Sequence, residues 1–348
     1  MTPLGSAGHG NAERIAPLVV FLHIPKTART TLGTLLRLHY GPGFRRIDTS
    51  GAHDPEVLRR RVELVLSRPG LAAAQGHFTA GVLDLLPERA LLGTILRDPI
   101  ERTLSQFHHL VTRVGRWQHD WLPPPSRDLT IAECIGERSY IGDNLQTRML
   151  CGTVSPIEPL PADAVERAKQ VLRDRFTFVG TTERFDEWLA LLNLKLGWPT
   201  VGYECAPAAP ERMCKGDISA ADLRQIEEAN ALDLEVYEHA AQLLAHTIEQ
   251  AGPELLDELE ILHSAQRRLS GAGDSGPAST ILRSLPAEAR VEFAVKEFQL
   301  LRATAEVKSL AKEARKRARA ERRMKELKRE LRRRTVKGRL ARLRARIG

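Results

Sequence analysis

A lysine stands in a short loop between an apolar segment and a stretch with helical spacing. Residues 18–24 (LVVFLHI) are apolar and rich in β-branched side chains, which is typical of a buried parallel strand. Lys26 follows in PKTAR, and leucines then recur at near-helical intervals over residues 30–40, with Thr30 or Thr31 as the expected N-cap. A strand, a tight loop and a helix N-terminus bring backbone N–H groups and an ammonium group to one point. The sequence therefore predicts an anion site here.

A second charged motif lies in GTILRDPIERTLSQF. Arg97 ends a predicted strand, and Ser105 lies eight residues on, about two turns into the helix that follows. In an open α/β sheet the carboxyl ends of the strands line the ligand crevice. Arg97 offers a planar fork for a phosphate and Ser105 a hydroxyl donor. Together the two motifs predict a nucleotide with phosphates at two ends, bound without the GxxxxGK[ST] of a Walker A loop.

Strand-like and helix-like segments alternate along the first 250 residues. Further strands are predicted in LAAAQGHF, ALLGTILRDP and FTFVGTTERF, and helical patterns follow the last two. One of these helices opens with Pro99, a residue suited to a first helical turn, and residues 223–248 predict another helix. This alternation predicts an α/β fold with a parallel sheet covered on both faces.

With both motifs in view, the sequence resembles the sulfotransferases that use 3′-phosphoadenosine-5′-phosphosulfate (PAPS). Their two donor-binding signatures are similar to HIPKT with the small or hydroxyl residues after it, and to RDPIERTLSQF. The specific likeness is to the heparan-sulfate 2-O-sulfotransferase-like carbohydrate sulfotransferases and their bacterial relatives. DNLQTRMLCG, FVGTTERFDEWLALL and NALDLEVYEHA extend the resemblance over residues 18–244. It implies a P-loop-like three-layer fold with a central parallel sheet.

The resemblance also implies the contacts with PAPS. The loop would surround the 5′-phosphosulfate, while Arg97 and Ser105 would bind the 3′-phosphate. The loop residues are Lys26, Thr27, Ala28, Arg29, Thr30 and Thr31. Arg29 departs from the family pattern, which usually has Gly or Ser at this place. It either adds a guanidinium contact to the phosphosulfate or crowds the loop and disables catalysis.

The motif QGHF places His77 at the end of a predicted strand, where the resembled branch carries a Gly-His that supplies the catalytic base. Sulfuryl transfer requires a hydroxyl to lose its proton as it attacks sulfur, and a histidine with an ordinary pKa of about 6.5 suits that step. Lys26 would stabilise charge on the departing phosphate, and no metal is expected. Glu183 or Asp143 is the alternative base.

Charge is distributed unevenly along the 348 residues. The net charge is +8, but from Arg283 onwards there are 23 Lys and Arg against 8 Glu, so the remainder is mildly acidic. We predict a flexible N-terminus (1–16), a sulfotransferase-like α/β domain (17–265), a linker (266–285) and a C-terminal basic helical extension or tail (286–348). The tail suits an anionic membrane surface or polysaccharide. It has no aromatic residue after Phe298, which argues against base stacking with nucleic acid.

Cellular location is inferred from several absences in the sequence. No apolar run approaches the ~18–20 residues of a membrane helix, and no signal peptide is evident at the start. The four cysteines show neither CxxC nor metal-ligand spacing, which indicates free thiols in a reducing compartment. The Ala, Arg and Leu-rich composition is typical of a bacterial protein. We expect a cytoplasmic enzyme, held peripherally at the inner membrane face, that sulfates a carbohydrate or glycolipid hydroxyl.

Two other functions stay open. One is a catalytically inactive nucleotide-binding or scaffold domain, disabled by Arg29, whose basic tail binds an anionic membrane or polymer. The other is a metal-dependent enzyme related to nucleotide kinases, which the missing Walker A residues and Mg²⁺ ligands disfavour. Turnover of PAPS would exclude the first, and strict Mg²⁺ dependence of nucleotide binding would favour the second.

Overall fold

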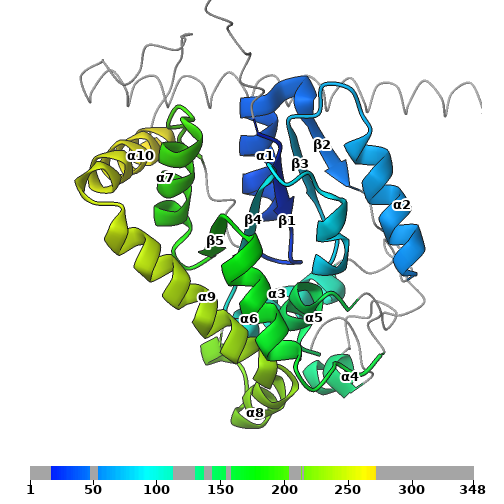
Figure 1. The fold of residues 1–348 in the computed structure, drawn as a ribbon. Coiled ribbons are helices and arrows are strands. Elements are labelled where there is room, and N and C mark those ends of the chain that lie inside the picture. Colours follow the sequence, from blue (N-terminus) through cyan, green and yellow to red (C-terminus); the bar gives the residue numbers. More distant parts are fainter. Residues whose placement is uncertain are drawn as a thin grey trace, which may run out of the picture.

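The computed structural model describes residues 17–47, 54–112, 130–136, 143–153, 158–203, 213 and 215–271. The predicted N-terminal segment, the basic tail and most of the predicted linker lie outside these residues. Five parallel strands form the central sheet in the order β2-β3-β1-β4-β5 (Figure 1). The strands are β1 (Val19–Leu22), β2 (Phe44–Ile47), β3 (Ala73–Gly76), β4 (Leu91–Leu96) and β5 (Phe178–Thr181).

Helices connect and cover these strands. They are α1 (Arg29–Tyr40), α2 (Pro55–Leu66), α3 (Pro99–Thr112), α4 (Ile131–Gly136), α5 (Leu145–Cys151), α6 (Ala164–Arg175), α7 (Phe185–Leu196), α8 (Ala220–Ala229), α9 (Ala231–Gln250) and α10 (Pro253–Gly271). Short 3₁₀ segments complete the set: η1 (Gly41–Gly43), η2 (Ala80–Leu85) and η3 (Lys215–Asp217). No helix among the described residues is long and apolar enough to cross a membrane.

The central strand β1 packs against helices on both of its faces. Val20 and Leu22 belong to one buried cluster, with α2, α5, α6 and the first half of α9. Val19 and Phe21 belong to another, with α1, α7 and α10. Successive strand residues point to opposite faces, so the apolar run VVFL serves both layers. The predicted α/β fold with a covered parallel sheet is confirmed.

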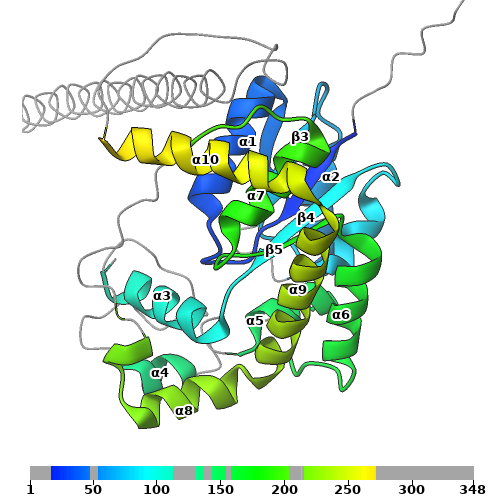
Figure 2. The same ribbon diagram turned by 90° about the vertical axis from the view of Figure 1, so that its left-hand side faces the viewer.

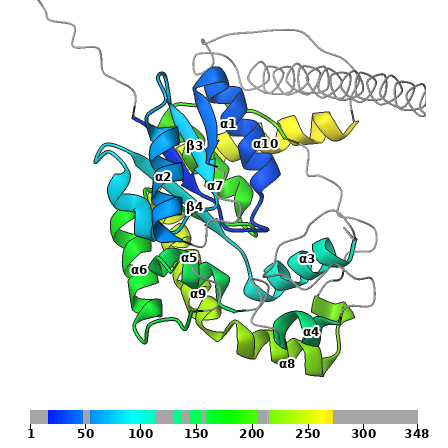
Figure 3. The same cartoon turned by 90° about the vertical axis from the view of Figure 1, so that its right-hand side faces the viewer.

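A third apolar cluster lies beyond the carboxyl end of β4. It joins α3, α4 and α8, which Figures 2 and 3 show gathered at one end of the molecule. Its buried residues are Ile100, Leu104, Phe107, Leu110, Ile131 and Ile226. Because α3 leaves β4 directly, this cluster places the helix of the second motif beside the end of the sheet.

Three elements differ from the sequence-based expectations. Strand β2 was not anticipated, because its four residues FRRI hold two exposed arginines between two buried ends. The predicted single helix at residues 223–248 is two helices, α8 and α9, separated at Asn230, whose side chain donates to the Ile226 carbonyl at 2.8 Å. Helix α10 runs six residues into the predicted linker, since Ala265 is buried and Gln266 donates to Asp186 at 3.2 Å.

Candidate active site

The loop between β1 and α1 has an unusual backbone. Lys26 and Ala28 have positive φ angles of 73° and 56°, whereas Thr27 between them does not. Such a change of handedness at successive residues turns backbone N–H groups towards one concavity, which suits an anion. The Thr27 side chain is fully buried, and its hydroxyl donates to the Ile24 carbonyl at 2.8 Å. Thr27 therefore braces the loop from within.

Helix α1 begins at Arg29, two residues earlier than an N-cap at Thr30 would allow. Ala28 is the N-cap and makes no side-chain capping bond, so Thr30 and Thr31 lie within the first turn. The first backbone N–H groups of an α-helix have no partner inside the helix, and the Ala28 side chain caps none of them. The prediction of a threonine N-cap was wrong, because Ala28 in the left-handed region already turns the chain into the helix. The open helix start strengthens the case for an anion at this point.

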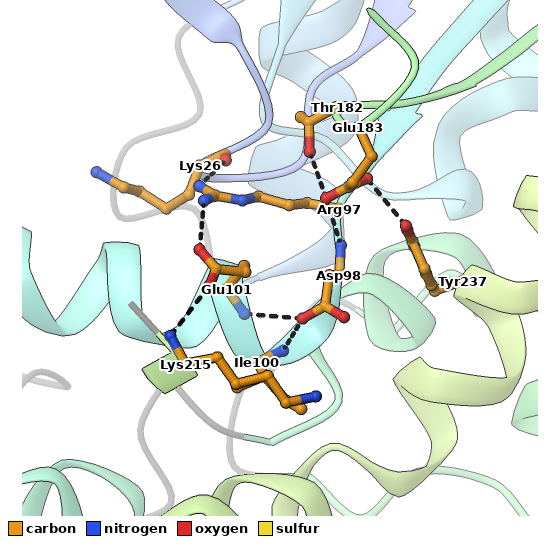
Figure 4. Close-up of polar contacts among 9 residues, drawn as sticks. All are labelled: Lys26, Arg97, Asp98, Ile100, Glu101, Thr182, Glu183, Lys215 and Tyr237. Carbon is orange, nitrogen blue, oxygen red and sulfur yellow. Dashed lines mark hydrogen bonds and ion pairs between the residues drawn. The ribbon is translucent and has the colours of Figure 1, made fainter. Parts of the chain in front are cut away.

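The two sequence motifs meet in space. Arg97 follows β4, and its Nη1 donates to the Lys26 carbonyl at 3.3 Å (Figure 4). The connection from β1 runs towards β2, whereas that from β4 runs towards β5, so the sheet order reverses between these two strands. Such a switch point is where α/β sheets bind ligands. Figure 4 also shows the Lys26 side chain extending away from the Arg97 guanidinium, which leaves two separate cationic positions.

Glu101 is the acidic neighbour of Arg97. Its Oε2 lies 3.2 Å from Arg97 Nη2, and its Oε1 accepts the backbone N–H of Lys215 at 3.3 Å (Figure 4). Ser105 is four residues further along α3, so it shares the helix face of Glu101. The structure thus brings Arg97, Ser105 and the η3 segment towards one place.

His77 follows β3 and reaches across to β1 and α1. Its Nδ1 lies 2.9 Å from the His23 carbonyl, and its Nε2 lies 3.4 Å from Arg29 Nη1. A carbonyl only accepts and a guanidinium only donates. These contacts assign the proton of a neutral His77 to Nδ1 and leave a lone pair on Nε2. In this tautomer Nε2 can accept a proton.

The glycine of the Gly-His pair has a packing role. A Cβ on Gly76 would lie 2.6 Å from the Ile47 carbonyl oxygen, closer than side chains tolerate. Gly76 also accepts the His23 backbone N–H at 2.8 Å, which aligns the ends of β1 and β3. The two histidine rings then lie 4.7 Å apart, centroid to centroid. The glycine therefore allows the close strand packing from which His77 projects.

Positive groups are concentrated around His77. Burial lowers the pKa of His23 well below 6.5, and nearby His77, Arg29 and Arg46 lower it further. The exposed Arg46 of β2 has a lowered pKa too, through partial burial and through Arg29 and Arg37. Its Nη2 would lie 3.2 Å from a Cβ on Gly33, so it reaches over α1. This surface is suited to a negatively charged ligand.

The two carboxylates considered as alternative bases are engaged elsewhere. Glu183 accepts hydrogen bonds from the Asp98 amide, the Thr182 hydroxyl and the Tyr237 hydroxyl at 3.1, 2.9 and 3.0 Å (Figure 4). Asp143 pairs with Arg148 at 2.6 Å. Their geometry favours structural roles, whereas His77 presents Nε2 beside the loop.

Several residues near the site were not identified as functional from the sequence. Arg46 lies in the unanticipated strand β2. Gln146 lies in a segment noted only for its family resemblance, and Asp233 and Tyr237 lie in a predicted helix to which no function was assigned. No local pattern distinguishes them, since each contacts the site through partners far away along the chain. Among the described residues no group of three or more His, Cys, Asp or Glu is arranged to hold a metal ion.

Fold and site together define an α/β protein with a loop suited to an anion at a sheet switch point and a histidine beside it. No protein-family model matches the chain. The chain is 28% identical over 315 residues to heparan-sulfate 6-O-sulfotransferase 1-B of Danio rerio, which covers 75% of each protein. It is 29% identical over 280 residues to heparan-sulfate 6-O-sulfotransferase 1 of Cricetulus griseus and of Homo sapiens, over 65% of this chain and 67% and 65% of theirs.

These similarities confirm the resemblance to carbohydrate sulfotransferases that the two motifs indicated. The relatives named here are 6-O-sulfotransferases, whereas the sequence motifs suggested the 2-O-like branch. The agreement is therefore at the level of carbohydrate sulfotransferases rather than at that of a particular branch.

Proposed function

We propose that the protein is a sulfotransferase that moves the sulfuryl group of PAPS to a carbohydrate hydroxyl. The observation that carries this proposal is the contact between the two motifs, Arg97 Nη1 to the Lys26 carbonyl at 3.3 Å, at the switch point of the sheet. The similarity to heparan-sulfate 6-O-sulfotransferases supports the reaction class and a carbohydrate acceptor.

The residues fit a donor with phosphate groups at two ends. The loop with Lys26, Ala28 and the open start of α1 offers an ammonium group and backbone N–H groups for the 5′-phosphosulfate. Arg97, whose side chain is only 12% exposed, offers a planar fork for the 3′-phosphate, with Ser105 on the adjoining helix face. Thr27 shapes the loop instead of facing the donor. In this arrangement the donor binds without a metal ion.

His77 is assigned the role of base. As the acceptor oxygen forms its bond to sulfur, its proton passes to Nε2, while the bond from sulfur to the 5′-phosphate oxygen breaks. The electron pair of that bond stays on the departing phosphate, where the Lys26 ammonium stabilises the added negative charge. The His23 carbonyl keeps the proton on Nδ1 and thereby keeps Nε2 available.

Arg29 has a defined place in this mechanism. Its Nη1 covers His77 Nε2, so the guanidinium has to move before a hydroxyl can bind there. A negatively charged sulfuryl group beside the loop attracts Arg29 and provides the force for that movement. If Arg29 instead stays on Nε2, the protein is the inactive nucleotide-binding domain considered above. Measured transfer therefore decides between these alternatives.

The acceptor is proposed to be a carbohydrate, free or within a glycolipid. Arg29 and Arg46 are exposed and both lie close enough to His23, beside His77, to lower its pKa, which favours an acceptor that carries negative charge. A cytoplasmic location and contact between the basic tail and an anionic membrane surface stay predictions. The tail lies outside the described residues.

The experiment is calorimetric titration, without Mg²⁺, using adenosine 3′,5′-bisphosphate (the desulfated donor product) and AMP. These ligands differ only by the 3′-phosphate. We expect the bisphosphate to bind at least about tenfold more tightly, because a charge-assisted contact contributes about 1.5–3 kcal/mol. Arg97→Ala should remove this preference, whereas Lys26→Ala should lower the affinity for both nucleotides.

The exposed Lys195 of α7 supplies a matched control, and Lys195→Ala should bind both ligands as the unaltered protein does. Equal affinity of the unaltered protein for the two nucleotides would contradict the assignment of the 3′-phosphate site. Transfer is then measured with labelled PAPS and heparan sulfate or desulfated heparan sulfate as acceptor.

A further inference from the structure

The backbone of Arg97 is held by one buried side chain. Gln146 of α5 accepts the Arg97 amide on Oε1 at 3.0 Å and donates from Nε2 to the Arg97 carbonyl at 2.8 Å. Gln146 has no exposed surface. Arg97 lies one residue beyond β4, where the strand no longer determines its backbone. Gln146 therefore completes the backbone hydrogen bonding at the residue from which the guanidinium extends.

Gln146 is itself fixed by a reciprocal arrangement of two helix starts. Asp233 of α9 accepts the backbone N–H groups of Gln146 and Thr147 at 3.1 and 2.7 Å. Asn144, the N-cap of α5, accepts the backbone N–H groups of Leu232 and Asp233 at 2.8 and 3.0 Å. Each helix thus receives its N-terminal side-chain cap from the other. Asp233 has no exposed surface and Asn144 is only 9% exposed, so solvent does not compete for these bonds.

A second side chain holds the next residue. The Asp98 amide donates to Glu183 Oε1 at 3.1 Å, and Glu183 Oε2 accepts the Tyr237 hydroxyl at 3.0 Å (Figure 4). Tyr237 is four residues beyond Asp233, so both lie on one face of α9. One helix face therefore supports both side chains that fix the turn after β4.

We propose that Gln146 is a positioning residue for Arg97, and that the paired starts of α5 and α9 hold it in that role. The inference rests on the proposed function, because its consequence is recognition of the 3′-phosphate. An arginine side chain loses considerable rotamer freedom when it binds, and a fixed backbone limits the directions that it samples. Displacement of the Arg97 backbone would misdirect the guanidinium fork.

The test compares affinities for adenosine 3′,5′-bisphosphate and AMP in Gln146→Met, which keeps the length of the side chain and removes both hydrogen bonds. We expect the preference for the bisphosphate to fall about tenfold, while the affinity for AMP is unchanged. In the Arg97→Ala background, Gln146→Met should reduce the preference no further, because the two residues act through one contact. A merely structural role would lower the melting temperature without changing this ratio.

Asn193→Leu is the matched control. Asn193 is another buried side-chain amide, 2% exposed, and its Nδ2 donates to Glu258 Oε1 at 3.0 Å. This hydrogen bond joins α7 to α10 and does not involve the turn after β4. The Asn193→Leu variant should lower stability and leave the ratio of affinities unchanged. Tyr237→Phe is a milder second variant that removes one bond to Glu183, and it should reduce the preference about threefold.

A folded Gln146→Met protein with the unaltered preference would overturn the inference. If Gln146→Met does not fold, Asn144→Gly replaces it: glycine tolerates the positive φ of this position, and the change removes the side chain that caps α9. An unaltered preference in that variant would overturn the role of the paired helix starts. Failure of the proposed function differs, because the unaltered protein itself would then show no preference for the bisphosphate.

Discussion

The loop after β1 and the turn after β4 hold their cationic side chains in different ways. In the loop, backbone torsions at Lys26 and Ala28 and the start of α1 set the shape, and Arg29 at its end is exposed. In the turn, Arg97 is largely buried, and its backbone is fixed by Gln146. The first region is built from contiguous residues, whereas the second depends on α5 and α9.

This difference matches the tasks proposed for the two regions. Arg29 has to leave His77 Nε2 when ligands bind, so an exposed side chain on an open helix start suits it. Arg97 is proposed to recognise a phosphate without moving, and a buried hydrogen-bonded frame suits that task. In this proposal the side chain that moves, Arg29, lies beside the proposed base, and the side chain that stays fixed, Arg97, binds the 3′-phosphate. Each of the following predictions tests one part of this contrast.

The largest effect is expected at His77. His77→Ala should reduce sulfuryl transfer by about 10²–10⁴-fold, because the hydroxyl loses its general base. Its affinity for adenosine 3′,5′-bisphosphate should stay unchanged, since the ring contacts His23 and Arg29 instead of the turn after β4. Transfer from labelled PAPS and calorimetry measure the two quantities.

The exposed His246 of α9 provides the matched control for that variant. His246→Ala should keep both transfer and nucleotide affinity. A His77→Ala protein with undiminished transfer would remove His77 as the base. One that mainly loses nucleotide affinity would place His77 among the donor-binding residues and weaken the contrast between the regions.

The next effect concerns acid stability of the β1–α1 side. His39 stacks on Trp198 with ring centroids 4.2 Å apart, and burial lowers its pKa to about 4. In the unfolded chain His39 has an ordinary pKa of about 6.5, so as the pH falls the unfolded state binds this proton before the folded state does. His39 should therefore reduce the free energy of unfolding by about 3 kcal/mol between about pH 6.5 and pH 4. Denaturant unfolding at several pH values measures this slope.

His39→Phe keeps an aromatic ring on Trp198 and removes the titrating group. The slope of the unfolding free energy against pH should then decrease by the equivalent of up to one bound proton. An unaltered slope would show that His39 is not the titrating group. On the other side of the site, burial raises the pKa of Asp233, so the folded state binds this proton before the unfolded state does as the pH falls. The contribution of Asp233 to the pH dependence of stability is therefore opposite in sign to that of His39.

The smallest effect is expected at Glu101. Its carboxylate lies 3.2 Å from Arg97 and would repel a 3′-phosphate, while its other oxygen accepts the Lys215 amide. Glu101→Gln keeps an acceptor and removes the charge, so the preference for adenosine 3′,5′-bisphosphate over AMP should rise about threefold, or by ~0.7 kcal/mol. The matched control is Glu187→Gln, which disrupts the ion pair between Glu187 of α7 and its N-cap residue Arg184. It should leave the preference for the bisphosphate unchanged. Weaker binding by Glu101→Gln would instead make Glu101 part of the rigid frame.

Much of the fold followed from local patterns, and the exceptions have physical reasons. The apolar runs that became β1, β3, β4 and β5 are buried enough to be recognised without a partner. Strand β2 was missed because half of its side chains are exposed arginines, so it has no apolar run. Backbone pairing with β3 makes it a strand, and that pairing is not visible in its composition. The break at Asn230 was missed because the apolar spacing continues across it.

The sequence by itself determined where the charged groups stand. Neighbouring residues make a strand, a loop and a helix, so the local sequence is enough to place Lys26, Arg97 and His77 at strand ends. Only the tertiary structure decided what these groups touch: Arg97 at the Lys26 carbonyl, Arg29 at His77, and Gln146 at the Arg97 backbone. Hydrogen bonds between residues 48 to 89 positions apart have no period in the sequence, because any polar side chain satisfies the same donor or acceptor. Packing of the sheet and helices selects one partner among them.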